Sequence, residues 1–405
     1  MKMELHNSLI NNSKAKAAEA IVSNCVHCGF CMATCPTYQL LGDERDSPRG
    51  RIDLIKQLLE EGSASKNTRT HLDRCLSCRS CETTCPSGVE YGRLLDIGRD
   101  VIEEQQTRPI LDKIKRSALL WLMPYSGRFT PALRLGQFFS PILPEFLCRK
   151  IPARQRPSNR PTKTHTRIML ALAGCAQPGA TPNTNAATAR VLDKLHIQLL
   201  EPGNSGCCGA MSYHLSKEND ALDFARQNID AWWPHIKAGA EAIIVTASGC
   251  GTMVKDYGAL LADDPAYAEK SARVSALAKD LTEIFLNEDL AALPMSLTSN
   301  RTAVHCPCSL QHGQQLPNAM DTVLSGLGFD LVETQEKHLC CGSAGTYSIL
   351  QPALSEQLLD NKLAALNVGQ PQQIVTANVG CQIHLASKSS VPVRHWIEIV
   401  DEAII

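Results

Sequence analysis

The chain has 405 residues, of which 44% are apolar and 20% are charged, and its formal net charge is −1. This balance is that of a globular protein of two to four domains, and it gives no electrostatic argument for a nucleic-acid partner. The chain has eighteen cysteines, but its size and the lack of an apolar signal in the first 20 residues exclude a small disulfide-rich secreted protein. We therefore expect a cytosolic or membrane-peripheral protein whose clustered cysteines carry metal or redox chemistry.

Two short cysteine arrays lie near the start of the chain. The first array, residues 25–36, reads CVHCGFCMATCP, and the second array, residues 75–86, reads CLSCRSCETTCP. Both follow the spacing C-x2-C-x2-C-x3-C-P, which is typical of bacterial ferredoxins with two [4Fe–4S] clusters. Three thiolates of an array converge on one cluster, whereas the fourth reaches the other. The predicted ligands are Cys25, Cys28, Cys31 and Cys85 for cluster 1, and Cys75, Cys78, Cys81 and Cys35 for cluster 2.

Two alternatives to clusters explain these arrays less well. Structural zinc usually takes its ligands as two separated pairs, not as four in a tight run. Disulfides between cysteines three residues apart would be strained, and a reducing compartment disfavours them. Iron–sulfur clusters are the better interpretation because the full spacing occurs twice.

Helices are predicted between and after the arrays. Residues 47–62 begin with Ser47 and Pro48, a suitable cap and first-turn pair, and end at Gly62. Residues 91–105 read as a second helix after the second array. We expect these segments to form a helical, ferredoxin-like domain over residues 1–105.

The composition changes over residues 106–165, the predicted connector. Residues 108–167 contain thirteen Lys and Arg but two acidic residues, and residues 119–147 are rich in apolar side chains. No apolar run reaches the roughly 18–20 residues that a membrane span needs. Three positions stay open for the apolar stretch: on the chain's own domains, on a partner subunit, or on an anionic membrane surface.

An α/β pattern begins near residue 166. Four short β-branched runs each end at a cysteine, and helix-like segments such as residues 353–366 lie between them, which predicts parallel sheets. The cysteine spacing also repeats, because Cys175 and Cys308 are each followed after 31 residues by a Cys-Cys-Gly triplet. Two tandem CCG modules are therefore predicted, over residues 166–290 and 291–405.

Each module offers a further candidate metal or redox site, because its cysteines lie where strands lead into helices. Helix N-termini at such places favour negatively charged thiolates. The candidate ligands are Cys175, Cys207, Cys208 and Cys250 in the first module, and Cys306, Cys308, Cys340, Cys341 and Cys381 in the second. Three nearby histidines can tune or replace a ligand: His305, His312 and His384. Cys148 reads as a lone packed thiol.

The chain lacks the motifs of organic cofactor sites. It has no G-x-G-x-x-G after a strand, no Walker loop and no G-x-S-x-G elbow. A cluster-rich chain without a flavin or nicotinamide site is expected to pass electrons rather than to oxidise a substrate by itself.

Several stretches resemble the iron–sulfur subunit of bacterial glycolate oxidase, also called glycolate dehydrogenase, and the likeness runs nearly end to end. They include NCVHCGFCMATCPTYQLLGDERDSPRGRI, HLDRCLSCRSCETTCPSGVEYGRLLDIGRD, GCCGAMSYHL, HLCCGSAGTYS and VRHWIEIV. The expected fold class is α+β and multidomain: an N-terminal α-helical di-cluster ferredoxin domain, followed by two tandem α/β, parallel-sheet CCG modules.

The resemblance implies the electron-transfer subunit of an oxidoreductase complex. FAD-binding subunits would oxidise glycolate to glyoxylate, and D-lactate as well. Electrons would then cross the two [4Fe–4S] clusters of this chain, and any further cluster in the CCG modules, to a membrane acceptor such as a quinone. The resemblance also implies a cytoplasmic location, peripheral on the inner membrane, which suits the basic and apolar connector.

One departure from the family pattern concerns the modules. The fullest CCG modules of this superfamily end in C-x-x-C and bind a non-cubane [4Fe–4S] cluster through five cysteines. Here Met253 and His384 stand where the second thiol would be, so an ordinary cluster, zinc or a bare redox site stays open. Alternative functions are a CCG-type heterodisulfide or thiol reductase-like subunit, the corresponding cysteine-rich subunit of anaerobic glycerol-3-phosphate dehydrogenase, and a zinc-stabilised scaffold.

Overall fold

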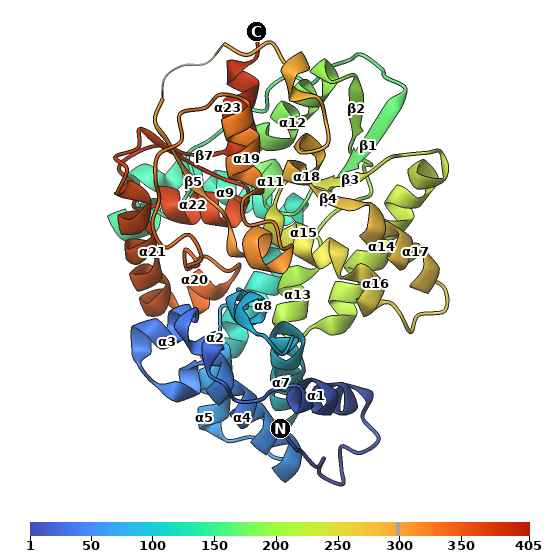
Figure 1. Cartoon of the computed structure of the whole chain (residues 1–405), viewed down its shortest axis with the longest axis vertical. Helices are drawn as coiled ribbons and strands as arrows, with labels where there is room; N and C mark the ends of the chain where they lie inside the picture. Colours follow the sequence, from blue (N-terminus) through green and yellow to red (C-terminus); the bar gives the residue numbers. More distant parts are fainter. Residues whose placement is uncertain (297–299) are drawn as a thin grey trace.

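A computed structural model describes residues 1–296 and 300–405 of the chain. A helical domain lies at the N-terminal end and two α/β modules lie at the C-terminal end, joined by a helical connector (Figure 1). This arrangement confirms the predicted fold class. Residues 297–299 of the predicted second module lie outside the described part, as do the side chains of residues 146 and 147, which end the apolar stretch of the connector.

The helical domain packs the apolar faces of α1, α4 and α7 together. The Ser47 hydroxyl accepts a hydrogen bond of 3.0 Å from the Gly50 amide at the start of α4, and Gly62 ends this helix in the left-handed region. The two predicted helices therefore form with the predicted bounds. The helices of this domain are α1 (Ser13–Ser23), α2 (Phe30–Ala33), α3 (Pro36–Leu41), α4 (Pro48–Glu61), α5 (Lys66–Asp73), α6 (Ser80–Thr84) and α7 (Tyr91–Gln105), with the short turn η1 (Glu44–Asp46) before α4.

The connector folds mainly into two helices, α8 (Ile110–Leu122) and α9 (Ser126–Phe139), followed by η2 (Ser140–Ile142) and α10 (Glu145–Cys148). No residue of α8 or α9 is fully buried. α9 lies against α11 of the first module, while many apolar side chains of both helices face outward. None of the helices in the two described ranges is long and apolar enough to cross a membrane.

The two modules repeat one parallel-sheet topology. The first sheet has the order β2-β1-β3-β4, and the second has the order β5-β6-β7. A parallel bridge between Thr302 and Leu331 lies beside β5, in the place that β2 takes beside β1. This shared order explains the repeated cysteine spacing. The strands are β1 (Arg167–Ala171), β2 (Ile197–Leu200), β3 (Ile243–Val245), β4 (Ala278–Asp280), β5 (Thr302–His305), β6 (Gln373–Thr376) and β7 (Val393–His395).

The helices of the modules surround these sheets. In the first module they are α11 (Gln177–Ala180), α12 (Asn183–Lys194), α13 (Ala210–His214), α14 (Glu218–Lys237), α15 (Ser248–Lys255), α16 (Tyr257–Leu260), α17 (Ala268–Leu277) and α18 (Leu281–Phe285), with η3 (Leu290–Ala292) after α18. In the second they are the π-helical turn η4 (Ser309–Gly313), α19 (Ala319–Gly326), α20 (Tyr347–Leu350), α21 (Pro352–Asn367), α22 (Val379–Ala386) and α23 (Trp396–Ala403). The predicted border at 290/291 falls inside η3, and all the predicted domain borders stay predictions.

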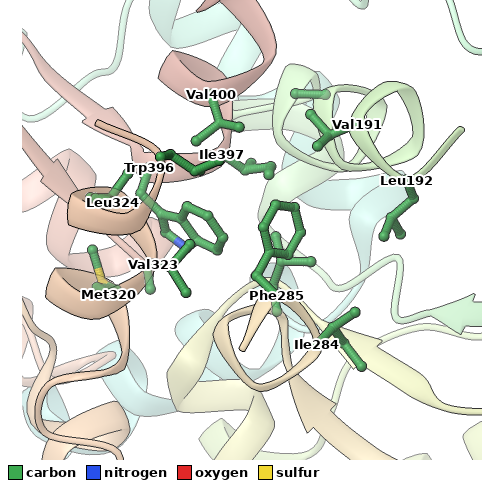
Figure 2. Close-up of a cluster of buried hydrophobic side chains, with 14 of the residues drawn as sticks. Val191, Leu192, Ile284, Phe285, Met320, Val323, Leu324, Trp396, Ile397 and Val400 are labelled. Atoms are coloured by element: carbon green, nitrogen blue, oxygen red, sulfur yellow. The ribbon is translucent and has the colours of Figure 1, made fainter. Parts of the chain in front are cut away.

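One apolar core joins the two modules (Figure 2). The ring of Trp396 on α23 meets the ring of Phe285 on α18 edge to face, with centroids 5.1 Å apart, and both side chains are fully buried. A backbone hydrogen bond also crosses between the modules, since the Ser248 amide of the first donates to the Ala377 carbonyl of the second at 2.9 Å. Burial of an aromatic ring contributes about 3–5 kcal/mol, judged by truncation to alanine, so the modules are expected to unfold together.

The helical domain contacts both modules. Arg79 forms an ion pair of 2.9 Å with Asp256 of the first module. The Tyr347 hydroxyl of the second module donates to the Arg74 carbonyl at 3.0 Å. These contacts place the second array against both modules.

Candidate metal centres

The first cavity, with a volume of about 440 Å³ and partly open to solvent, lies inside the helical domain. Apolar side chains such as Val26, Ile52 and Val89 form part of its wall. Its cysteines are Cys25, Cys28, Cys31, Cys81 and Cys85. The structure therefore brings together the four residues predicted for cluster 1, including the one that comes from the second array.

The second cavity, of about 300 Å³, lies beside the first. Its cysteines are Cys35, Cys75, Cys78 and Cys81, which are the four residues predicted for cluster 2. Cys35 reaches this cavity from the first array, so each array sends its fourth thiol to the other array's cavity. Cys81 lines both cavities, which places the two candidate clusters next to each other.

The backbone of the two arrays has the same unusual conformation. His27 and Gly29 in the first array have positive φ angles of 57° and 81°. Ser77 and Arg79 take the same positions in the second array, with φ angles of 53° and 57°. Left-handed residues at these positions curl the chain, so the successive thiols of each array line one cavity.

The thiols of these cavities need a cation to become thiolates. Burial raises the pKa of the Cys31 thiol to about 11, and the nearby Cys25 and Cys28 thiols add to the rise. Burial also raises the pKa of the Cys78 and Cys81 thiols well above the usual value. Metal binding offsets the cost of a buried negative charge and displaces the thiol protons. The residues present therefore fit two cysteine-ligated clusters.

Arg51 and Tyr91 line the second cavity but were not predicted as site residues. Arg51 is fully buried, and its guanidinium lies 4.0 Å from the Cys35 sulfur. The Tyr91 hydroxyl donates a hydrogen bond of 3.6 Å to the Cys75 sulfur. Helical spacing gave a signal for Arg51, because it lies four residues before Ile55 on the apolar face of α4.

The first module gathers its four predicted cysteines into a run of interacting thiols. Cys175 interacts with Cys207, and Cys208 interacts with Cys250. The bond with Cys207, together with burial, raises the pKa of the Cys175 thiol well above its usual value. Cys250 is the third residue of α15, so it lies in the first turn of this helix.

The second module repeats this arrangement. The Cys308 and Cys340 sulfurs lie 3.7 Å apart, and Cys341 interacts with Cys381, the third residue of α22. The Asn378 side-chain amide also donates to the Cys381 sulfur at 3.3 Å. As in the first module, the neighbouring Cys340 thiol and burial raise the pKa of Cys308.

Two glycines shape the Cys-Cys-Gly turns of the modules. Gly209 and Gly342 both have φ of +88°. A Cβ atom on Gly209 would lie 2.8 Å from the Ala221 carbonyl oxygen, and one on Gly342 would lie 2.6 Å from the Ser355 carbonyl oxygen. Only glycine fits this close approach, so the turn fixes the direction of the paired thiols.

The structure does not bring every candidate of the second module into this group. Cys306 is buried in the apolar core that joins the modules, where its thiol approaches the Leu316 carbonyl at 4.0 Å. His312 bonds Thr83 of the helical domain at 2.9 Å. His384 bonds the Ser355 hydroxyl at 3.1 Å. His305, by contrast, lies with Cys341 and Cys381, so that its ligand atom and theirs are all within 4.8 Å of one another.

Met253, which stands in place of the second thiol of the first module, is buried in that module's core beside Cys208 and Cys250. Cys148 is half-buried at the end of α10.

The second module also touches the helical domain at the second cavity. Cys78 shares an apolar cluster with Cys308, Cys340 and Tyr347. Burial is the main cause that raises the pKa of the Cys78 thiol, and the negative charge of the nearby Cys308 is the next. The cysteine groups of the two arrays and of the second module therefore form a continuous series.

Comparison with known proteins identifies the families of the helical domain and of the two modules. The 4Fe–4S dicluster domain family matches residues 21–89, and the cysteine-rich domain family, CCG, matches residues 169–255 and 302–386. The glycolate oxidase iron–sulfur subunit of Escherichia coli (strain K12) is 52% identical over 405 residues, which cover 100% of this chain and 99% of that protein.

The chain belongs to the family of glycolate oxidase iron–sulfur subunits. The probable glycolate oxidase iron–sulfur subunit of Bacillus subtilis (strain 168) is 30% identical, over 93% of this chain and 90% of that protein. The lactate utilization protein A of Bacillus velezensis is 27% identical but matches 54% of this chain. As a member of this family the chain is an iron–sulfur protein, and its dicluster domain is of the 4Fe–4S type.

Proposed function

We propose that this chain is the electron-transfer subunit of a complex that oxidises glycolate to glyoxylate, and D-lactate as well. The observation that carries the proposal is the identity of 52% over the full length to the E. coli glycolate oxidase iron–sulfur subunit. FAD-binding subunits perform the oxidation, since this sequence has no motif for an organic cofactor. A membrane acceptor such as a quinone takes the electrons.

The lining of the two cavities supports the predicted ligand sets. Cluster 1 is held by Cys25, Cys28, Cys31 and Cys85, and cluster 2 by Cys75, Cys78, Cys81 and Cys35. A bound [4Fe–4S] cluster accepts and releases one electron at a time. The protein's part is to hold the sites close together, exclude water and set the charge around them.

The order of sites supports a single line of transfer. Cys81 borders both cavities, and Cys78 lies in one apolar cluster with Cys308 and Cys340 of the second module. An electron at the first cavity therefore has a short path through the second cavity to the second module. Apolar packing between Cys78 and the second module shields the later part of this path from water.

The connector supplies the contact with the membrane. Ile110, Trp121 and Phe138 are 76%, 61% and 76% exposed, which is unusual for large apolar side chains. Basic side chains such as Lys113 and Lys115 lie between them. An exposed helix pair that is both apolar and basic suits the surface of an anionic membrane, and a cytoplasmic location at the inner membrane follows.

The test is to isolate the complex from its native host through a tag on this chain, under anaerobic conditions. We expect a brown protein with at least eight irons per chain, a co-purifying flavin subunit, and bleaching of the cluster absorbance on addition of glycolate. Cys28→Ser should retain the flavin subunit and its reduction by glycolate, but lose electron delivery to a quinone.

Two results would contradict the proposal. A colourless protein that contains zinc would support a scaffold. Reduction of a disulfide by the isolated chain without any flavin partner would support the heterodisulfide or thiol reductase alternative.

A further inference from the structure

His305 ends strand β5 inside the second module, and its side chain is fully buried. Its Nδ1 atom lies 2.9 Å from the Thr376 hydroxyl, whereas its Nε2 atom is buried without a hydrogen-bond partner. A buried polar atom without a partner destabilises the fold, unless a ligand or metal completes the site. A ligand atom of His305 and the sulfurs of Cys341 and Cys381 are all within 4.8 Å of one another, which is close enough for one metal centre to satisfy them all.

The hydrogen bond to Thr376 prepares this imidazole for coordination. When Nδ1 carries the proton and donates it to the hydroxyl oxygen, the lone pair remains on Nε2. Metal-binding histidines commonly have such a partner on the other ring nitrogen.

The first module lacks this residue. Cys175 and Cys308 hold equivalent positions, and three residues earlier stand Leu172 and His305. Leu172 is buried in the apolar core of the first module. The two modules therefore share their cysteines and their topology, but only the second has an imidazole at the cysteine group.

We propose that the second module holds an iron–sulfur cluster whose ligands are His305 Nε2 and the thiolates of Cys308, Cys340, Cys341 and Cys381. Cys306 is not a ligand, because it lies in the core between the modules. The neighbouring second cavity favours a redox-active site over structural zinc, since Cys78 is in one apolar cluster with Cys308 and Cys340. The ligand assignment goes beyond the proposed function, which requires no third cluster.

Histidine ligation has a consequence for the electron series. A neutral imidazole adds no negative charge to the centre, so it raises the reduction potential relative to ligation by thiolate alone, as in Rieske centres. With His305 in place of a fifth thiolate, the second module would then hold electrons more strongly than an all-cysteine centre at the same site. This suits a site at the far end of the series from the first cavity.

The test measures nitrogen coordination directly in the native complex. Protein grown with ¹⁵N-histidine and with ordinary histidine is compared by pulsed EPR in the oxidised and reduced states. We expect a ¹⁴N coupling from one imidazole in the unlabelled protein and its replacement by a ¹⁵N coupling in the labelled protein. His305→Leu, which copies the residue of the first module, should lose this coupling. The matched control is His384→Leu in the same module, which should keep it.

Iron analysis supplies a second readout that needs no paramagnetic state. His305→Leu and Cys341→Ser should lose the same number of irons per chain, while His384→Leu loses none. The proposal fails if His305→Leu keeps the full iron content and the nitrogen coupling of the native protein. It also fails if Cys341→Ser releases zinc instead of iron. Neither readout depends on glycolate turnover, so failure here is separate from failure of the proposed function.

Discussion

Arg51 places a positive charge beside the second cavity. Its guanidinium is fully buried and donates to the His71 carbonyl at 2.7 Å and to the Thr37 hydroxyl at 3.1 Å. Burial alone would lower the pKa of Arg51, but the neighbouring Cys75, Tyr91, Cys35 and Asp46 outweigh this effect and raise it. The charge is therefore permanent, and it offsets part of the negative charge of a thiolate-ligated cluster.

Replacement of this charge tests its electrostatic role. Arg51→Gln should lower the reduction potential of cluster 2 by roughly 100–200 mV, the size expected for one charge about 4–7 Å from the cluster at an effective dielectric constant of about 20. Redox titration followed by EPR measures the potential. Arg51→Lys keeps the charge and is the control, with a smaller shift expected. If Arg51→Gln keeps the full iron content and an unchanged reduction potential, the charge of Arg51 does not influence cluster 2.

The crossed ligand sets can be tested at the fourth cysteine of each array. Because Cys35 lines the cavity of Cys75, Cys78 and Cys81, Cys35→Ser should damage cluster 2 and leave cluster 1 intact. Cys85→Ser should do the reverse. Site-resolved EPR distinguishes the two clusters, and Cys148→Ser, at a cysteine outside both cavities, is the control. Loss of the cluster 1 signal in Cys35→Ser would refute the crossed assignment.

At the scale of elements, His395 connects the start of α23 to the first module. Its Nε2 atom donates to the Thr246 carbonyl at 2.8 Å, and its Nδ1 atom accepts from the Ile397 amide at 3.2 Å. The bond at Nδ1 requires the neutral ring in this tautomer, because both nitrogens of a protonated ring are donors. Burial lowers the pKa of His395 to about 4, despite the opposing effect of the bond to Thr246. The contact between the modules therefore depends on pH.

The sign of this dependence follows from linkage. The unfolded chain protonates His395 near pH 6.5, but the folded chain does so near pH 4, so stability falls as the pH decreases between these values. We expect this residue to cost about 2 kcal/mol in the free energy of unfolding between pH 7 and pH 5. Urea unfolding at both pH values measures the loss. His395→Gln, which cannot titrate, should show a smaller difference, and an equal difference in both proteins would exclude His395 as the cause.

At the scale of the whole molecule, α8 and α9 present an apolar surface that the described part of this chain leaves open. If this surface lies on a membrane, Trp121→Ser combined with Phe138→Ser should weaken binding to anionic vesicles at least tenfold, since each buried ring contributes about 1.5–3 kcal/mol. Vesicle flotation measures the binding. Val368→Ser, which removes a 48% exposed side chain at the end of α21, is the control. Equal binding by the double variant and the control would assign this surface another role.

Local sequence patterns predicted much of this architecture because they depend on near neighbours in the chain. Ser47, Pro48 and Gly62 mark the ends of α4, and the repeated cysteine spacing marks two modules of equal topology. Apart from Cys306, the predicted cysteines of each module lie together after the strands.

Other features depend on the register of distant segments. Cys306 and His305 are adjacent in sequence, but neighbouring side chains at a strand end point to opposite sides. His305 therefore lies with Cys341 and Cys381, whereas Cys306 is in the core between the modules. The partners of Arg51 likewise come from α3, η1 and α5 together, which no local pattern reveals.

Among the described residues, the second module places cysteines against Cys78, whereas the first contacts the helical domain through ion pairs such as Lys14 with Glu218 and Arg79 with Asp256. The two modules share a topology but differ in their contacts with the second cavity. On the proposed path, loss of the thiols of the second module would interrupt electron transfer, whereas loss of the thiols of the first module would leave the path intact. The first module should therefore tolerate cysteine substitutions better than the second.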